Sequence, residues 1–175
     1  GILGKSFIGN RAAQLFSAGN LSSLWTLLFN TPVPQIPEML LTAEIEKEAF
    51  NRFISQYTSF VAEYAKPDEI LIDQLCIYEA ENLKEVGGAL CAGEQKCPPV
   101  IDLGKFSKLN FAAYPDIRKI TEGTKFEWYD HVAGVHEQQR LEFKIDMQII
   151  DHLWKKKKKT GGETRAALQK LYLDE

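Results

Sequence analysis

The stretch Thr42–Ala65 reads TAEIEKEAFNRFISQYTSFVAEYA and gives the clearest structural signal in the sequence. Its apolar residues recur at steps of three, four and one, which is the pattern of an amphipathic helix. Thr42 is a suitable N-terminal cap, and Lys66-Pro67 marks the end of the helix. The stretch therefore predicts one long helix, whose apolar side consists of Ile45, Ala49, Phe50, Phe53, Ile54, Tyr57, Phe60, Val61 and Tyr64.

Helical signals continue on both sides of this stretch. Upstream, Asn20 is placed to cap a short helix over residues 21–30, and the proline-rich segment that follows is expected to be extended. Downstream, a second long helix is predicted from Pro67-Asp68 to Gly93. The paired Gly87-Gly88 within it indicate a close contact or a bend.

The second half of the chain contains one conflict between local signals. Residues 141–149 (LEFKIDMQI) alternate strictly between apolar and polar, which is typical of a half-buried strand. The composition favours a helix, however, and a lone strand among helices would leave its edges unpaired, so we predict a helix. Around it we predict a short helix over 117–121 capped by Asp116, a helical turn over 126–129, and a last helix over 160–175.

Together these segments predict an all-α protein built from tandem helical lobes of antiparallel helices. Residues 1–92 form the first lobe, residues 93–100 a polar, proline-bearing linker, and residues 101–175 a second, incomplete lobe. The same order of features recurs in both lobes: a capped short helix, a turn and a long amphipathic helix. Few residues are identical between the two, so the recurrence is equally expected of any two helical hairpins.

Composition narrows the classes of function. The 175 residues are 45% hydrophobic and 26% charged, which is an ordinary globular balance. The net charge of −3 argues against a surface built to bind nucleic acid, because phosphate affinity comes from accumulated Lys and Arg. The longest apolar stretch, residues 86–92, is far shorter than the ~20 residues that cross a bilayer. Any membrane contact is therefore expected to be peripheral.

Motifs for catalysis, cofactors or metals are not recognised in the sequence. His131 and His136 are separated by a spacing that does not place them on one helical face, and no cysteine lies nearby. The Gly-Lys-Ser at residues 4–6 lacks the first glycine and the preceding strand of a phosphate-binding loop. No serine sits in a Gly-x-Ser-x-Gly turn. We therefore expect no catalytic, cofactor-binding or metal-binding residues.

The segment Tyr78-Glu79-Ala80-Glu81-Asn82-Leu83-Lys84 resembles the signature of the C/d subunit family of V-type and archaeal-type rotary ATPases. In that family an aromatic residue and a Glu precede Asn-Leu-Lys in a helix. Residues 21–32 resemble the family's helix that ends in a polar residue and Thr-Pro. Leu141-Glu142, Asp146 and Ile150 resemble the spacing in its second repeat.

Two departures from the family pattern limit the comparison. After Lys84 the family usually continues with an aliphatic pair and Arg, whereas this chain has Glu85-Val86-Gly87-Gly88, so no role of that Arg is transferred. The chain is also about half of a typical family member. We interpret it as a fragment or a divergent relative.

The resemblance implies a non-catalytic subunit that couples the central stalk to the membrane rotor ring and so contributes to ion transport across the membrane. Its partners would be the central-stalk subunits and the ring of c-type subunits, and it would lie peripherally on the cytoplasmic face. Packed helices suit this task because protein interiors resist compression. The alternative is a helical protein–protein adaptor without a rotary partner, in which aromatic residues line a peptide groove.

Five consecutive lysines form the sharpest charge feature: Lys155, Lys156, Lys157, Lys158 and Lys159. The preferred interpretation is a solvated helix end, which the helix dipole favours. The functional alternative is contact with anionic lipid headgroups or with an acidic stalk surface. Glu81 and Asn82 are interpreted as residues that tie neighbouring helices together or face the stalk.

Overall fold

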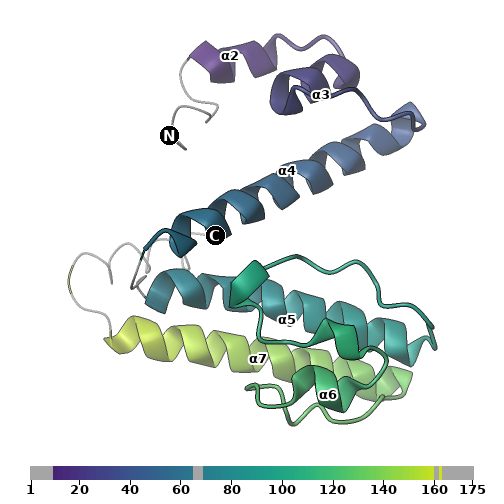
Figure 1. The fold of residues 1–175 in the computed structure, drawn as a ribbon, viewed down its shortest axis with the longest axis vertical. Coiled ribbons are helices and arrows are strands. Elements are labelled where there is room, and N and C mark those ends of the chain that lie inside the picture. Colours follow the sequence, from purple (N-terminus) through teal and green to yellow (C-terminus); the bar gives the residue numbers. More distant parts are fainter. Residues whose placement is uncertain (1–9, 65–68, 160–161, 163–175) are drawn as a thin grey trace. The chain divides into compact units, whose positions relative to one another are not determined.

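The computed structural model describes residues 10–64, 69–159 and 162, and the regular structure in these ranges is entirely helical (Figure 1). The predicted all-α class is thereby confirmed. None of the helices in these ranges is long and apolar enough to cross a membrane. The predicted helix over 160–175 lies outside the described residues.

The described residues form three long helices, α4 (Glu38–Ala62), α5 (Glu69–Cys91) and α7 (Val135–Lys159). The short elements are α2 (Asn10–Phe16), α3 (Leu21–Phe29), α6 (Ile117–Thr121) and the 3-10 turns η1 (Gly104–Phe106) and η2 (Phe111–Ala113).

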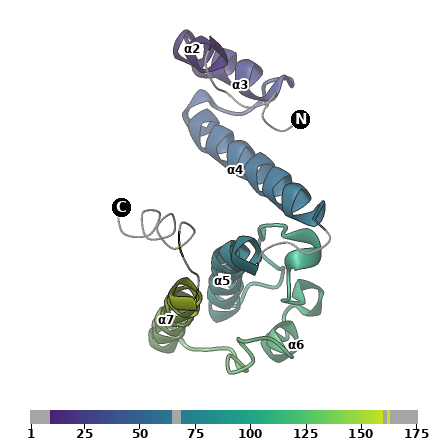
Figure 2. The same cartoon turned by 90° about the vertical axis from the view of Figure 1, so that its left-hand side faces the viewer.

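Contacts divide the chain into two compact units. The first unit ends at Phe60, and the second begins at Val61. This division differs from the predicted linker at residues 93–100. That segment is non-helical, as its prolines require, but α5 before it and α7 after it lie side by side and share one core (Figure 2). The polar, proline-bearing stretch thus ends a helix without separating two cores, because α5 and α7 on either side of it share one core.

In the first unit, α3 and α4 share a small core. The Asn20 side chain caps α3 as predicted, since its oxygen accepts the Ser23 N–H at 2.8 Å. Asn30 ends the same helix in the left-handed region, with φ of 52°. The buried residues are Trp25 and Phe29 from α3, and Leu41 and Ile45 from α4.

The long helix α4 confirms the first prediction but begins earlier than Thr42. It starts at Glu38, directly after Pro37, because the fixed φ of proline suits the entry to a helix. Arg52 connects this helix to the end of α3: its Nη1 donates to the Phe29 carbonyl at 3.2 Å and its Nε to Glu48 at 2.7 Å. The guanidinium also lies over the Phe29 ring, 4.8 Å from its centroid.

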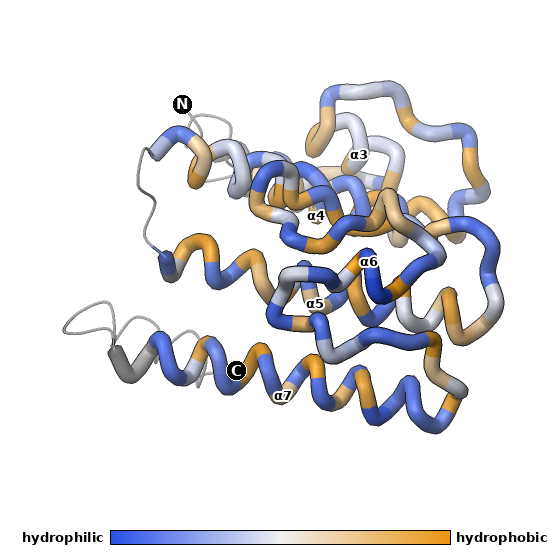
Figure 3. The backbone as a smooth tube through the Cα atoms, turned by 60° about the horizontal axis from the view of Figure 1, so that its bottom comes forward, coloured by the Kyte–Doolittle hydropathy of each residue, from blue (hydrophilic) through white to orange (hydrophobic). Residues whose placement is uncertain are grey.

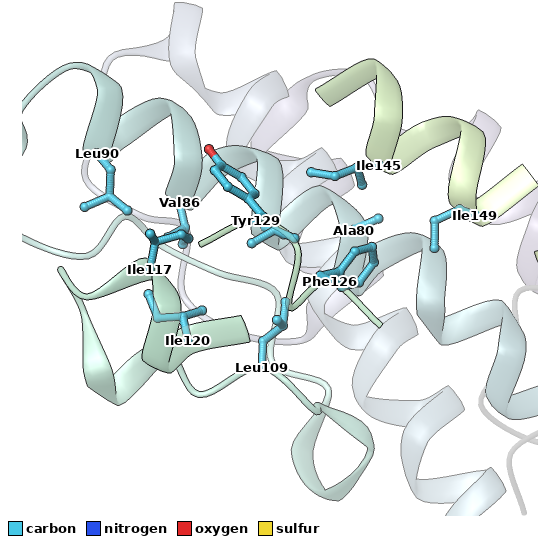
Figure 4. Packing of buried hydrophobic residues seen from close by; sticks show 11 residues of the cluster. Ala80, Val86, Leu90, Leu109, Ile117, Ile120, Phe126, Tyr129, Ile145 and Ile149 are labelled. Atoms are coloured by element: carbon cyan, nitrogen blue, oxygen red, sulfur yellow. The ribbon is translucent and has the colours of Figure 1, made fainter. Parts of the chain in front are cut away.

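In the second unit, α5 and α7 run antiparallel and bury one core together with the chain between them (Figure 4). Leu83 and Val86 of α5 and Ile145 of α7 are fully buried, as is Phe126 of the intervening segment. Burial of such side chains stabilises the unit by roughly 1.5–3 kcal/mol each. The other members of the core are Ala80, Leu90, Leu109, Ile117, Ile120, Tyr129 and Ile149.

The conflict at residues 141–149 is resolved in favour of the predicted helix, and α7 shows its cause. Figure 3 shows hydrophobic and hydrophilic positions alternating along the middle of α7. Residues four apart share one face of a helix, whereas residues two apart point to opposite sides. Ile145 and Ile149 are therefore buried against α5, while Phe143, Met147 and Ile150, here called the outer stripe, are exposed. The sequence alternates as a strand does because this one helix carries apolar residues on two opposite faces.

The segment before α7 follows its predicted caps and turns with one exception. The Asp116 side chain accepts the Lys119 N–H at 3.3 Å and caps α6, and Gly123 follows with a positive φ of 69°. The helical turn predicted over 126–129 is instead a non-helical turn. The buried Thr121 hydroxyl donates to the Tyr129 carbonyl at 3.0 Å. The carbonyl thus has a hydrogen-bond partner although the turn is not helical.

Candidate functional site

The segment Tyr78–Lys84 lies in the middle of α5, and its side chains divide between the core and the solvent. Leu83 is fully buried, and Glu79 and Asn82 are also buried although they are polar. Glu81 is exposed. Buried polar groups require hydrogen-bond partners, so the contacts of Glu79 and Asn82 define what this segment does.

The Asn82 side chain forms hydrogen bonds with the backbone just after the predicted linker, at Ile101. Its Nδ2 donates to the Ile101 carbonyl at 2.8 Å, and its Oδ1 accepts the Ile101 N–H at 2.6 Å. The side-chain amide thus satisfies both backbone groups of one non-helical residue, as a neighbouring strand would. Asn82 ties a helix to a non-helical segment, where the sequence predicted that it ties neighbouring helices together or faces the stalk.

Glu79 performs the same task one helical turn earlier. Its Oε1 accepts the N–H groups of Lys108 and of Leu109, the second at 3.2 Å. A carboxylate that accepts backbone N–H groups makes charge-assisted bonds, which are about twice as strong as neutral ones. Glu79 and Asn82 together fasten residues 101–109 along α5.

Lys84 joins the two stretches that carry the family resemblance. Its ammonium lies 2.7 Å from Glu81 on α5 and 2.9 Å from Asp146 on α7. Burial acts to lower the pKa of Lys84, but the hydrogen bonds to the two carboxylates outweigh it, so the pKa is raised. The lysine stays charged and links α5 to α7.

A groove of about 400 Å³ lies beside the exposed residues of this segment, and most of the charged residues that line it are acidic. Its lining comes from α5, from α7 and from the chain just after α5. Four carboxylates face it and one ammonium, that of Lys84, so the groove presents excess negative charge. The lining residues are Glu81, Lys84, Glu85, Gly88, Ala89, Glu94 and Glu142.

Gly87, the first of the paired glycines in α5, has a steric role. A Cβ on Gly87 would lie 2.3 Å from the Tyr129 hydroxyl oxygen and 2.7 Å from Gln138 Nε2, whereas a Cβ on Gly88 would meet nothing within 4 Å. The Tyr129 hydroxyl donates to Gln138 Oε1 in this space, and burial raises the pKa of Tyr129 to about 12. The close contact that the paired glycines indicated is confirmed at Gly87.

The lysine run is described only in part. Lys155 pairs with Asp151 at 2.5 Å, and Lys156 pairs with Glu69 and lies 3.7 Å from Asp73. The hydrogen bond to Glu69 is the main cause that raises the pKa of Lys156. The side chains of Lys157, Lys158 and Lys159 lie outside the described residues, and contact of the run with lipid or stalk stays a prediction.

The histidines that the sequence singled out do not converge. His131 is exposed, with Nδ1 2.9 Å from Asp130 and Nε2 3.1 Å from Glu137. His136 lies instead beside Gln139, Arg140 and Phe143. The third histidine, His152, faces α5.

Two features of the structure were not found from the sequence. One is the outer stripe of α7, whose signal was present as the alternation over 141–149 but was assigned to secondary structure alone. The other is a cluster of Asp73, Cys76 and His152. Its only local signal is the spacing of three between Asp73 and Cys76, which places both on one face of a helix.

Comparison with known proteins gives one relative and no family. The chain is 25% identical over 176 residues to an uncharacterized protein of Treponema pallidum (strain Nichols). The match covers the whole of this chain and 51% of the relative, so the chain spans about half the length of the curated relative it matches. No family model matches the sequence. No solved structure matches it either.

Proposed function

We propose that this chain is a non-catalytic helical subunit of a rotary V/A-type ATPase, and that it couples the central stalk to the membrane rotor ring on the cytoplasmic face. The observation that carries the proposal is the ion pair between Lys84 and Asp146. It joins two segments that resemble the C/d subunit family and that are 62 positions apart in the sequence. The two segments lie on facing helices, α5 and α7.

Coupling requires a stiff body, and the second unit has the features of one. Its two long helices share a fully buried core, and the chain between them is fastened to α5 by Glu79 and Asn82. A densely packed core deforms little under load. The unit therefore suits a part that passes force from one partner to another.

Coupling also requires a surface for a partner, and the outer stripe of α7 supplies one. Phe143 is 67% exposed, Met147 48% and Ile150 58%. A helix that is apolar on both sides is usually packed on both sides. The acidic groove beside Lys84 adds a second surface of different chemistry, suited to a basic partner.

The test is binding to purified partners encoded beside this gene. The chain is immobilised and exposed separately to the central-stalk subunits and to detergent-solubilised c-type ring, and binding is measured by surface plasmon resonance. We expect saturable binding to at least one of them, and weaker binding after Phe143→Asp and Met147→Lys on the outer stripe. The matched control changes the exposed Phe16 and Met39 of the first unit in the same way and is expected to bind as the unaltered chain does.

The second candidate is a helical adaptor without a rotary partner, which the outer stripe favours as well. The two functions differ in their partners. Binding to neither the stalk subunits nor the ring contradicts the coupling function and favours the adaptor. Equal loss of binding in the control variant places the contact outside α7.

A further inference from the structure

Three metal-ligating side chains meet between α5 and α7, near the N-terminal end of α5. Asp73 and Cys76 lie one turn apart on α5, and His152 faces them from α7. One carboxylate oxygen, the sulfur and one imidazole nitrogen all lie within 4.8 Å of one another. Figure 1 shows the two helices side by side along this region. The antiparallel packing brings together residues that are 76 or more positions apart in the sequence.

The contacts of Asp73 leave one of its carboxylate oxygens without a hydrogen bond from the described residues. Asp73 is only 8% exposed. Its Oδ1 lies 2.8 Å from His152 Nε2, but its Oδ2 is buried without a hydrogen-bond partner among the described residues. Among the described residues, the Lys156 ammonium lies 3.7 Å from this oxygen and is also paired with Glu69. A buried carboxylate oxygen without a hydrogen bond is costly, so this atom is suited to accept a further positive group.

We propose that Asp73, Cys76 and His152 bind a divalent cation of the zinc class. A carboxylate oxygen, a thiolate sulfur and an imidazole nitrogen form a donor set that suits zinc, at distances of about 2.0–2.3 Å. The three donor atoms, now within 4.8 Å of one another, have to move closer to reach these distances, and we expect side-chain rotation to bring them there. The cation replaces the contact between Asp73 and His152, and the Cys76 thiol releases its proton to the solvent as it becomes a ligand. Water or an external ligand completes the fourth position.

The position of the site gives the cation a structural consequence that is independent of the proposed function. Lys84 and Asp146 link α5 and α7 at one point, whereas Asp73 lies 11 residues before Lys84 on α5 and His152 lies six residues after Asp146 on α7, so the two contacts hold the helix pair at different points along its length. Two of the ligands come from α5 and one from α7. Binding therefore holds the helices together and raises the thermal stability of the second unit, because only the folded chain presents all three ligands.

The test is titration of the whole 175-residue chain with Co²⁺ and Zn²⁺ in reducing buffer. We expect one equivalent of Co²⁺ to bind, with a thiolate-to-cobalt charge-transfer band in the near ultraviolet that Zn²⁺ abolishes. Cys76→Ser should remove the band and weaken Zn²⁺ binding by at least about 100-fold, since loss of a mere outer-shell partner costs about 10- to 100-fold. His152→Ala should have the same effect from the opposite helix.

Two further variants separate this site from incidental thiol binding. Cys97→Ser alters an exposed cysteine outside the cluster and should leave the band and the affinity unchanged. Lys156→Gln removes the competing ammonium and should raise Zn²⁺ affinity roughly 2- to 5-fold, as expected for one partly exposed charge. Circular dichroism confirms that each variant is folded. The absence of saturable binding, a band that survives Cys76→Ser, or a band that Cys97→Ser removes would each overturn the proposal and leave an ordinary ion pair.

Discussion

At the scale of single residues, a few side chains fix how the second unit packs. Gly87 leaves room for the Tyr129 hydroxyl, and Asn82 satisfies both backbone groups of Ile101. Each of these residues has a counterpart of the same type at an unconstrained position. The contribution of each contact can therefore be measured against a matched control.

The two adjacent glycines should respond oppositely to the same change. Gly87→Ala places a methyl group against Tyr129 and Gln138, so we expect a loss of about 1–3 kcal/mol in the free energy of unfolding. Gly88→Ala meets open space and should gain up to about 1 kcal/mol from the higher helix propensity of alanine. Urea denaturation followed by circular dichroism gives both values. Equal effects of the two substitutions would contradict the close contact.

Asn82 should be far less tolerant than an exposed asparagine on another helix. Asn82→Ala leaves the partly buried N–H and carbonyl of Ile101 unpaired, which should cost about 1–3 kcal/mol of unfolding free energy. Asn51→Ala on the exposed side of α4 should change the same quantity by less than about 0.5 kcal/mol. The measurement is chemical denaturation of both variants. A small effect at Asn82 would show that the Ile101 segment is held by other contacts.

His131 should titrate above the ordinary histidine pKa of about 6.5. The hydrogen bond to Asp130 is the main cause that raises its pKa, and Glu137 adds to it. Because the pKa is higher in the folded state, the ion pair stabilises the protein below pH 6.5 while the carboxylates are ionised, and this contribution is lost as pH rises through the folded pKa. The effect on stability is small because the pair is exposed.

Proton NMR titration of the imidazole measures this pKa directly. The variant Asp130→Asn, Glu137→Gln should return the pKa of His131 toward its ordinary value. A pKa at or below that value in the unaltered chain would show that neither carboxylate holds the ring in solution.

At the scale of elements, α7 is the helix whose two faces have different tasks. Ile145 is fully buried against α5, whereas Ile150 belongs to the outer stripe. The strand-like alternation of this segment arises from the two faces, and it could not be separated from a true strand by periodicity alone. The amino-acid composition predicted the helix correctly, because the intrinsic helix preference of a residue does not depend on which face of the helix it occupies.

The two isoleucines of α7 should show this division in energies. Ile145→Ala should cost about 2–5 kcal/mol in the free energy of unfolding, because it leaves a cavity in the core. Ile150→Ala should cost less than about 0.5 kcal/mol, since the side chain is already exposed. Denaturation curves of the two variants provide the comparison. Similar losses would mean that the outer stripe is packed in the isolated chain.

The order of elements was easier to predict than their contacts. The caps at Asn20 and Asp116 and both long helices around Pro67 follow from local chemistry, and all are present. The start of α4 was misplaced because Pro37 and Thr42 are both good start signals, and sequence does not rank them. The recurring order of a capped short helix and a 25-residue helix appears in α3–α4 and in α6–α7.

At the scale of the whole molecule, the prediction from sequence was least complete. A boundary placed at residues 93–100 follows from composition, but a core is defined by which faces meet, and α5 and α7 meet across that segment. The cluster of Asp73, Cys76 and His152 was missed for the same reason, because no local pattern connects the two helices. Asn82 was predicted to tie neighbouring helices or to face the stalk, whereas its side chain binds the backbone of the non-helical Ile101, which no local pattern indicates.

The lysine run should be dispensable for the fold as a whole. Replacing Lys155–Lys159 with glutamine removes the pairs of Lys155 with Asp151 and of Lys156 with Glu69, but no core residue. We therefore expect the helical circular dichroism to be retained. A large loss of helical signal would show that the run is required for folding, and that its role is not limited to solvation or partner contact.

The two-faced composition of α7 also bears on what happens when the second unit opens. Once the helix is lost, residues 141–149 become an extended chain with apolar side chains on one side only, which is the arrangement that initiates intermolecular sheets. Glu142, Lys144 and Asp146 interrupt this segment with charges and act as gatekeepers against self-association. Keeping this segment helical in the folded state therefore also protects the chain against aggregation.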